Sequence, residues 1–287
     1  MGIYDLFGGS ERAYTSNSWV EKQRALRDKA FSDADKSCGR IKESGAELSK
    51  YLTVQARFDR YSVTNAMLIS MNHSNATQLK DENSWRNAGA FVKQEAEPII
   101  ILEPGKEYRR EDGSRGTYHN PKEVYDISQT TIKDRAEEKG FPSVGELVTA
   151  LIKASPVPFQ PVDDLENSAY YDKEQGVIFV KKGLTETQLV LSMAKEAATA
   201  VYDLKYEKGR NETDFKSYCI AYMIGSKYGL NTASFNFDTL PSEYASMDNK
   251  EFKQEMTSIR NVFSDIQSQM NRSLDKSKTE VSHGGRW

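Results

Sequence analysis

The sequence predicts an α+β protein, with an N-terminal α+β domain that holds a small antiparallel sheet and a mostly helical second domain with a β-hairpin. Two observations predict this class. Apolar residues recur at a 3.6-residue period over 19–58, 186–204 and 249–274, as they do in amphipathic helices. Short β-branched runs at 98–102, 124–127 and 176–180 are bounded by turn residues, which indicates strands.

The chain is long enough for two domains. Its 287 residues allow each domain to bury its own core. Three prolines between 156 and 161 prevent regular helix after a predicted helix at 144–153. We place the boundary ahead of this stretch, so that the predicted domains span 1–135 and 136–287.

The first domain is expected to begin with helices. Helix-forming residues run without proline over 19–58, and Ser16 or Ser18 is available as an N-cap. A break near Cys38–Gly39 is predicted to divide this stretch into two helices. A third helix is predicted over 62–71.

Strands follow in the first domain. The run 98–102 predicts a buried strand that ends in a turn at Glu103–Gly105. A second turn is expected at Asp112–Gly113, and Val124–Ile127 predicts a further strand.

The second domain is predicted to contain one hairpin and several helices. The hairpin covers 170–180, a helix follows over 186–204, and the next helix ends before Gly229. A final helix over 249–274 places six apolar residues on one stripe, namely Phe252, Met256, Ile259, Phe263, Ile266 and Met270. The polar tail 276–287 is expected to be mobile.

Charge and cysteine content exclude some classes of protein. The net charge is −3, with 21 Lys and Arg against 20 Asp and Glu in 1–135, and 18 against 22 in the remainder. Neither part is a basic domain, so nucleic acid would have to be held by a local patch and by stacking. Cys38 and Cys219 are too few for a disulfide framework or a cysteine zinc site, and both are expected to be reduced and structural.

The sequence also predicts where the protein resides. Met1–Ser10 has no basic segment followed by an apolar one, and no apolar run approaches the roughly 18 to 20 residues that span a bilayer. We therefore expect a cytoplasmic protein without membrane contact.

Ordered motifs in the first domain resemble ArdC-type antirestriction proteins. These motifs are Tyr61–Asn65, Asn75–Thr77, Trp85, Phe91–Lys93, Pro98–Pro104 and Val124–Thr130. The resemblance implies a domain associated with binding of single-stranded DNA. One departure is Lys93-Gln94-Glu95, because the family tends to have a glycine in this turn.

The same stretch interleaves aromatic and basic residues, which could form a stacking groove for unpaired bases. For each ring, core packing is the competing interpretation, above all for Trp85. Asp126 or Ser128 could instead cap a helix near Thr131. The candidate DNA-binding residues are Tyr61, Asn65, Trp85, Lys93, Lys106, Arg109, Arg110, Arg115 and Gln129.

The second domain resembles the metallopeptidase-like domain that follows in the ArdC family. There a helix carries His-Glu-x-x-His, whose two histidines bind zinc while a later helix supplies a third ligand. In this chain Lys195 and Thr199 occupy the histidine positions, only Glu196 survives, and Lys216 or Tyr218 stands where an acidic ligand is expected. Neither protonated Lys nor Thr is a useful zinc ligand, so we expect no metal, no cofactor and no catalysis.

The sequence leaves three classes of function. The resemblance implies a non-catalytic accessory protein of a mobile element or phage, which binds single-stranded DNA or inhibits a host defence protein. The alternative is a protein-interaction or scaffold module without DNA binding, which the near-neutral charge favours. An active zinc metallopeptidase is the least favoured class, and the sequence predicts no particular oligomeric state.

Overall fold

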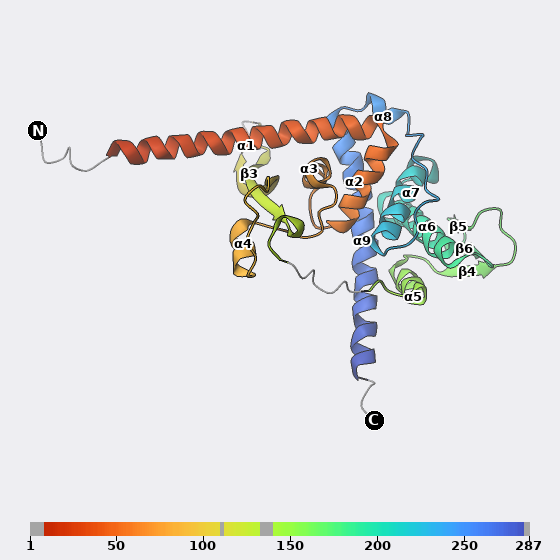
Figure 1. The fold of residues 1–287 in the computed structure, drawn as a ribbon. Coiled ribbons are helices and arrows are strands. Elements are labelled where there is room, and N and C mark those ends of the chain that lie inside the picture. Colours follow the sequence, from red (N-terminus) through yellow and green to blue (C-terminus); the bar gives the residue numbers. More distant parts are fainter. Residues whose placement is uncertain (1–8, 110–111, 133–139, 284–287) are drawn as a thin grey trace, which may run out of the picture. The chain divides into compact units, whose positions relative to one another are not determined.

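The computed structural model describes residues 9–109, 112–132 and 140–283 and has the predicted α+β fold (Figure 1). The chain divides into two compact units. One comprises Met1–Gly39 and Thr64–Arg135, and the other comprises Arg40–Val63 and Ala136–Trp287. Residues 40–63 thus group with the second unit. The division into domains 1–135 and 136–287 stays a prediction.

The first helix is longer than predicted. α1 runs without interruption from Gly9 to Glu43, so Ser16 and Ser18 lie inside the helix and the predicted break at Cys38–Gly39 is wrong. The helix ends instead before Ser44, whose side chain accepts the backbone N–H of Glu47 and caps α2 (Gly45–Arg57). A single glycine within a helix costs only about 1 kcal/mol, and a long helix tolerates it.

Position 45 shows why the chain turns where it does. A Cβ added at Gly45 would lie 1.9 Å from the carbonyl oxygen of Phe237. Only glycine permits this close approach at the start of α2.

The first unit contains a three-stranded antiparallel sheet in the order β1-β3-β2. Its strands are β1 (Leu79–Lys80), β2 (Ile99–Arg109) and β3 (Arg115–Asp126). The turn predicted at Glu103–Gly105 is wrong, because β2 continues through it with a register shift between Pro104 and Glu107. Short helices α3 (Val63–His73) and α4 (Glu82–Asn87) and the 3-10 turn η2 (Ile127–Gln129) complete the unit.

One apolar cluster in the core of the first unit joins α1, α3 and β2. Ala30 and Ala34 of α1 pack with Leu68 of α3 and Leu102 of β2. Trp19, the first residue of the periodic stretch 19–58, is exposed.

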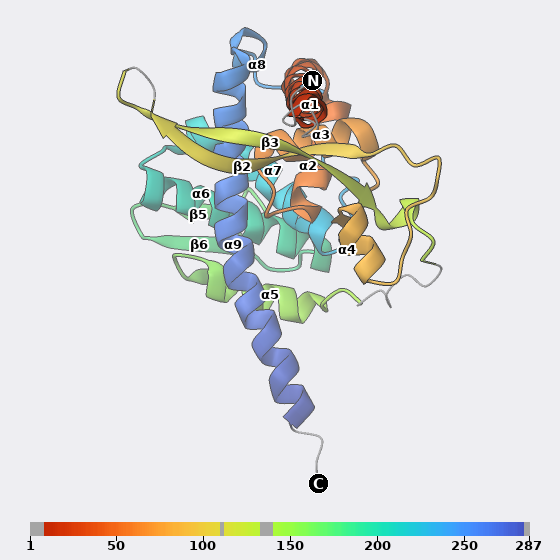
Figure 2. The same ribbon diagram turned by 90° about the vertical axis from the view of Figure 1, so that its left-hand side faces the viewer.

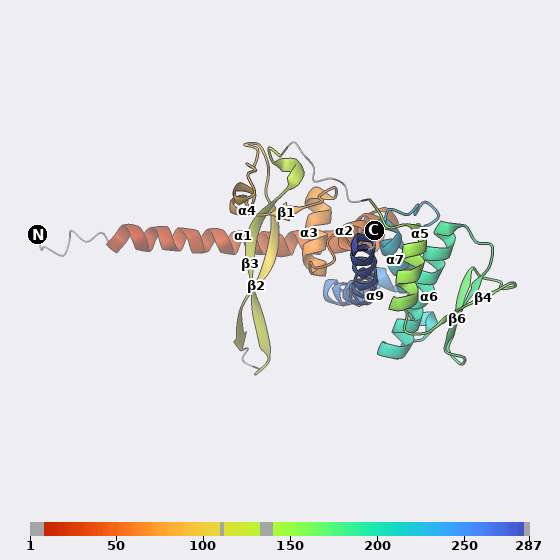
Figure 3. The same cartoon turned by 90° about the horizontal axis from the view of Figure 1, so that it is seen from below.

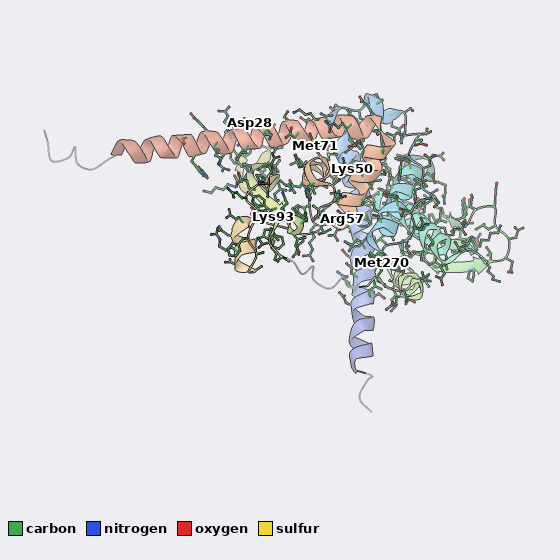
Figure 4. All side chains as sticks on the ribbon, viewed as in Figure 1. Asp28, Lys50, Arg57, Met71, Lys93 and Met270 are labelled. Carbon is green, nitrogen blue, oxygen red and sulfur yellow. The ribbon has the colours of Figure 1, made fainter. Side chains whose placement is uncertain are left out.

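Helices dominate the second unit. All six residues of the predicted apolar stripe on α9 (Asn249–His283) are buried, which confirms that face of the helix. Met270, labelled in Figure 4, is one of them. α9 continues through most of the predicted tail, and no described helix is long and apolar enough to cross a membrane. The other helices of this unit are α2, α5 (Val144–Ala154), α6 (Glu186–Tyr206), α7 (Arg210–Lys227) and α8 (Glu243–Ser246).

The second unit also contains a three-stranded mixed sheet in the order β4-β6-β5. β5 (Ala169–Asp172) and β6 (Val177–Lys181) form the predicted hairpin. β4 (Phe159–Val162) is an additional strand that pairs in parallel with β6. Pro161 lies within it, which is compatible with a strand at the edge of a sheet. α6 contacts β5 and β6, and α7 packs along α6 (Figure 3).

Candidate functional site

The candidate DNA-binding residues of the first unit centre on a two-stranded ribbon formed by β2 and β3 (Figure 2). β1 pairs only with Tyr125 and Asp126 at one end of β3. The other end of the ribbon therefore has no third strand, and its side chains are exposed on both faces.

One face of the ribbon carries two tyrosines. The ring centroids of Tyr108 and Tyr118 lie 4.4 Å apart. Tyr108 pairs with Gly116, where an added Cβ would come within 2.5 Å of the Tyr108 ring. Glycine thus lets the ring lie across the partner strand, as aromatic side chains cover glycines in other sheets. The two tyrosines remain 37% and 50% exposed, which leaves ring surface for a ligand.

The other face carries two arginines. Successive side chains of a strand point to opposite faces, so Arg109 points away from the face of Tyr108. Arg109 is paired directly with Arg115, and like charges in this position destabilise an antiparallel pair. Glu107 lies 3.6 Å from Arg115. Among the described residues, no carboxylate forms an ion pair with Arg109. The ribbon therefore separates an exposed cationic face from an exposed aromatic face.

The other basic residues predicted near this turn are less defined. Lys106 is exposed beside the register shift of β2. Arg110 lies outside the described residues.

Three of the predicted DNA-binding side chains hold the fold of the first unit together. The Asn65 amide donates to the carbonyl of Leu102 and accepts from its N–H. Trp85 is 1% exposed and donates its indole N–H to the carbonyl of Tyr125. The Gln129 side chain accepts from the N–H of Asp126 and donates to the carbonyl of Glu97. Their polar groups have partners within the protein, which is a structural role.

Asp126 organises the end of β3. Its buried carboxylate accepts the backbone N–H groups of Thr77, Gln78 and Ser128 and the hydroxyl of Ser128. Burial alone raises the pKa of Asp126, but these hydrogen bonds outweigh burial and hold the pKa below its usual value. Asp126 caps η2, which is the capping interpretation left open by the sequence, with a 3-10 turn in place of a helix.

The remaining two predicted residues do not belong to the ribbon. Lys93, labelled in Figure 4, donates to the carbonyl of Ser128. Tyr61 belongs to the second unit, where its ring packs edge-on against Phe58 at 5.6 Å. The single groove expected from the sequence thus resolves into exposed ribbon residues and residues with other partners.

The four positions that the sequence predicts to be a degenerate metal site, Lys195, Glu196, Thr199 and Tyr218, lie on α6 and α7. The Lys195 ammonium lies 2.7 Å from the Asp214 carboxylate. Glu196, 3% exposed, accepts two hydrogen bonds from Arg210 and a third from the backbone N–H of Tyr171. The hydrogen bond to Glu196 is the largest cause that raises the pKa of Arg210 above its usual value.

The other two predicted positions, Thr199 and Tyr218, also form hydrogen bonds within the protein. The Thr199 hydroxyl donates to the hydroxyl of Ser217, which is fully buried. The Tyr218 hydroxyl accepts the backbone N–H of Asn236 at 2.7 Å. Ser217, which sequence reasoning missed, is therefore the residue of α7 that faces the second lost histidine position.

The residues present do not fit a metal ion. Of the described residues, no three His, Cys, Asp or Glu side chains form a group that could hold one. Glu196 is paired with the Arg210 guanidinium, and the protonated Lys195 offers no lone pair to a metal.

Arg210 and Asp214 were also missed by sequence reasoning. The available signal was Glu196 itself, since a carboxylate within an apolar helix face requires a cation nearby. The i, i+4 spacing of Arg210 and Asp214 on α7 then supplies both partners from one helix face.

A cavity of about 580 Å³ opens at this site. β5, α6, α7 and the segment Ser234–Phe235 line it, and Lys195, Glu196, Arg210, Asp214 and Tyr218 all belong to the lining.

Two solved structures are similar to this chain, although no similar sequence is found. No protein-family model and no curated protein matches the chain. The metal-free crystal structure of the antirestriction protein ArdC from plasmid R388 is similar at 13% identity, with a TM-score of 0.48, over 76% of this chain and 86% of that one. The Mn(II)-bound structure of ArdC gives 14% identity and the same TM-score of 0.48, over 75% and 84%.

ArdC belongs to the family that the sequence motifs resemble. At this identity and TM-score, the likeness transfers no residue role to the present chain. Each role rests on the contacts described above.

Proposed function

We propose that this protein is a non-catalytic, ArdC-like accessory protein of a mobile element or phage, which binds single-stranded DNA and acts against a host defence system. The observation that carries the DNA-binding part is the exposed Arg109–Arg115 pair on the opposite face from Tyr108 and Tyr118. The antirestriction part rests on the motifs and on similarity to ArdC, whose structures are those of an antirestriction protein.

The two-faced ribbon favours a single strand over a duplex. Stacking on an exposed tyrosine requires an unpaired base and contributes about 1–3 kcal/mol per base. A single strand is flexible enough to place bases on the tyrosine face while its phosphates pass the ribbon edge towards Arg109 and Arg115. A duplex keeps its bases stacked and offers only phosphate contacts.

The like-charged pair supports an anionic ligand. Two arginines held opposite each other repel, and a phosphate between or beside them removes this repulsion when it binds. Because few cations take part, binding should depend only moderately on salt. Each phosphate contact should contribute about −0.7 to the slope of log K against the logarithm of the salt concentration.

A mobility-shift titration tests this part. Labelled 20-nucleotide single strands and the matching duplex are compared with wild-type protein and with Arg109→Ala/Arg115→Ala. The matched control is Arg24→Ala/Arg27→Ala, which removes the same charge from α1 at the exposed Arg24 and the half-buried Arg27. We expect weaker single-strand binding by the ribbon variant only. Equal retardation of all three proteins would contradict the ribbon as the site.

The non-catalytic part rests on the pairing of Glu196 with Arg210 and on the absence of a metal-binding group among the described residues. Elemental analysis of purified protein, with and without added zinc or manganese, tests it. Stoichiometric metal that survives dialysis would contradict this part and leave DNA binding unaffected.

A protein-interaction module is the second candidate. The near-neutral charge of the whole chain favours it, because a scaffold needs no excess of cations. Recovery of one specific host protein on nuclease-treated beads, together with no retardation of single strands, would favour this candidate over DNA binding.

A further inference from the structure

The cavity of the second unit has the size and lining of a small-ligand site. Its volume of about 580 Å³ falls within the range of roughly 300–1,000 Å³ that is typical of such sites. The walls combine apolar surface with a few converging charged groups. The uncharged residues of the lining include Tyr170, Leu191, Tyr218, Ala221 and Phe235.

Two cations share one exposed carboxylate at the cavity. The Asp214 carboxylate lies 2.7 Å from the Lys195 ammonium and 3.9 Å from the Arg210 guanidinium. The Asp214 side chain is 53% exposed, whereas that of Lys195 is only 29% exposed. Asp214 therefore occupies, from the solvent side, the position where an external anion would meet both cations.

Glu196 does not compete for that position. It is buried, and Arg210 and the backbone N–H of Tyr171 already bind its oxygens. The ring of Tyr170 lies against the Arg210 guanidinium, with 4.7 Å to the ring centroid, and restrains it further. Arg210 is thus fixed, while the Lys195–Asp214 pair is free to exchange partners.

Replacement of Asp214 by a ligand carboxylate costs little free energy. An ion pair this exposed contributes only about 0–1 kcal/mol, and a released Asp214 returns to water. The opposite exchange, with a ligand ammonium that displaces Lys195 from Asp214, would leave the less exposed Lys195 without its partner. Charge and exposure therefore favour an anionic ligand group over a cationic one.

We propose that this cavity binds a ligand with one carboxylate and an adjacent apolar body, and that the ligand carboxylate replaces Asp214 beside Lys195 and Arg210. Leu191, Ala221 and the rings of Tyr218 and Phe235 receive the apolar body. Both a free small acid and the C-terminal end of a peptide have this chemistry. The proposal is independent of DNA binding.

Isothermal titration calorimetry with N-acetyl-phenylalanine tests the ligand chemistry on the full chain. The matched probe is N-acetyl-phenylalanine amide, which has the same apolar body without the charge. We expect heat from the acid at millimolar concentration and none from the amide. No heat from either probe, or equal affinity for both, would overturn the proposal.

Two substitutions test the residues. Lys195→Gln should weaken binding of the acid about 10-fold, because it removes a charged hydrogen bond. Asp214→Asn should tighten binding about three- to fivefold, because the internal competitor is lost. The Lys195–Asp214 pair is partly exposed, so both variants should remain folded. Circular dichroism checks this.

The matched control is Lys208→Gln, which breaks the exposed Lys208–Glu212 pair outside the cavity lining. It should leave the affinity unchanged. An affinity that is unaltered by Lys195→Gln, or lowered equally by Lys208→Gln, would contradict the assigned site.

A final arm distinguishes the two sources of the carboxylate. An alanine-rich hexapeptide that ends in phenylalanine is compared with N-acetyl-phenylalanine, each as acid and as amide. Tighter binding of the peptide acid assigns a peptide C-terminus, and tighter binding of the small acid assigns a free metabolite-sized ligand.

Discussion

The ribbon of the first unit and the cavity of the second unit treat charge in opposite ways. On the ribbon, Arg109 and Arg115 face each other while exposed, with Glu107 beside only one of them. In the cavity, both cations have carboxylate partners, and the most buried acid has three hydrogen bonds. Repulsion left in place on a surface indicates a site that an external anion completes. Charges matched around the buried Glu196 indicate a pair that the fold itself uses, whereas the exposed Asp214 beside Lys195 is the partner that a ligand can replace.

The largest effect should come from Arg210→Ala. Removal of the guanidinium leaves Glu196 buried without a counter-charge, which should cost about 2–4 kcal/mol, somewhat below the range for a fully buried pair because Arg210 is partly exposed. Urea unfolding measures the change.

The double variant Arg210→Ala/Glu196→Gln sharpens this result. It should recover part of the loss, because no charge is then buried alone. If Arg210→Ala is as stable as the wild type, the Glu196–Arg210 pair does not stabilise the fold, and the contrast with the ribbon arginines is wrong.

Asp126 of the first unit is comparable to Glu196 of the second, since each is a buried carboxylate whose oxygens accept several hydrogen bonds. Asp126→Asn should cost about 2 kcal/mol at neutral pH, because an amide cannot accept all four hydrogen bonds. The folded-state pKa lies below the unfolded value, so this stabilisation is present above pH 4 and is lost as pH falls through the folded-state pKa. Wild type and variant should therefore converge in unfolding free energy at acid pH.

The ribbon should respond in binding and not in stability. Arg109→Ala/Arg115→Ala should weaken single-strand binding about 10-fold and reduce the logarithmic salt slope by about 1.4, as expected for two lost phosphate contacts. Its unfolding free energy should stay equal or rise by about 0.5 kcal/mol, because a repulsive pair is removed. A clear loss of stability would mean that the arginines serve the fold.

The smallest effect should follow Lys195→Ala. This residue adjoins Glu196 on α6, but its pair with Asp214 is exposed, so the change in unfolding free energy should be under about 1 kcal/mol. A loss as large as that of Arg210→Ala would contradict the distinction between the exchangeable and the fixed pair.

Much of the fold follows from local pattern. The stripe on α9, the β5–β6 hairpin and the approximate positions of α3 and α6 were predictable, because hydrophobic period and turn residues act over short distances. β4 was not, since parallel pairing with β6 joins residues that are separated in the sequence. The helix end at Ser44 and the strand through Pro104 also depend on partners elsewhere, namely Phe237 and β3.

The candidate sites divide in the same way. Coordination chemistry is a property of side-chain type, so the sequence alone determined that neither Lys195 nor Thr199 is a useful zinc ligand. Only the tertiary structure placed Arg210 against Glu196, Ser217 against Thr199, and the arginines and tyrosines of the ribbon on opposite faces. The physical reason is that residue type fixes what a group can bind, whereas strand register and helix packing decide which group it meets.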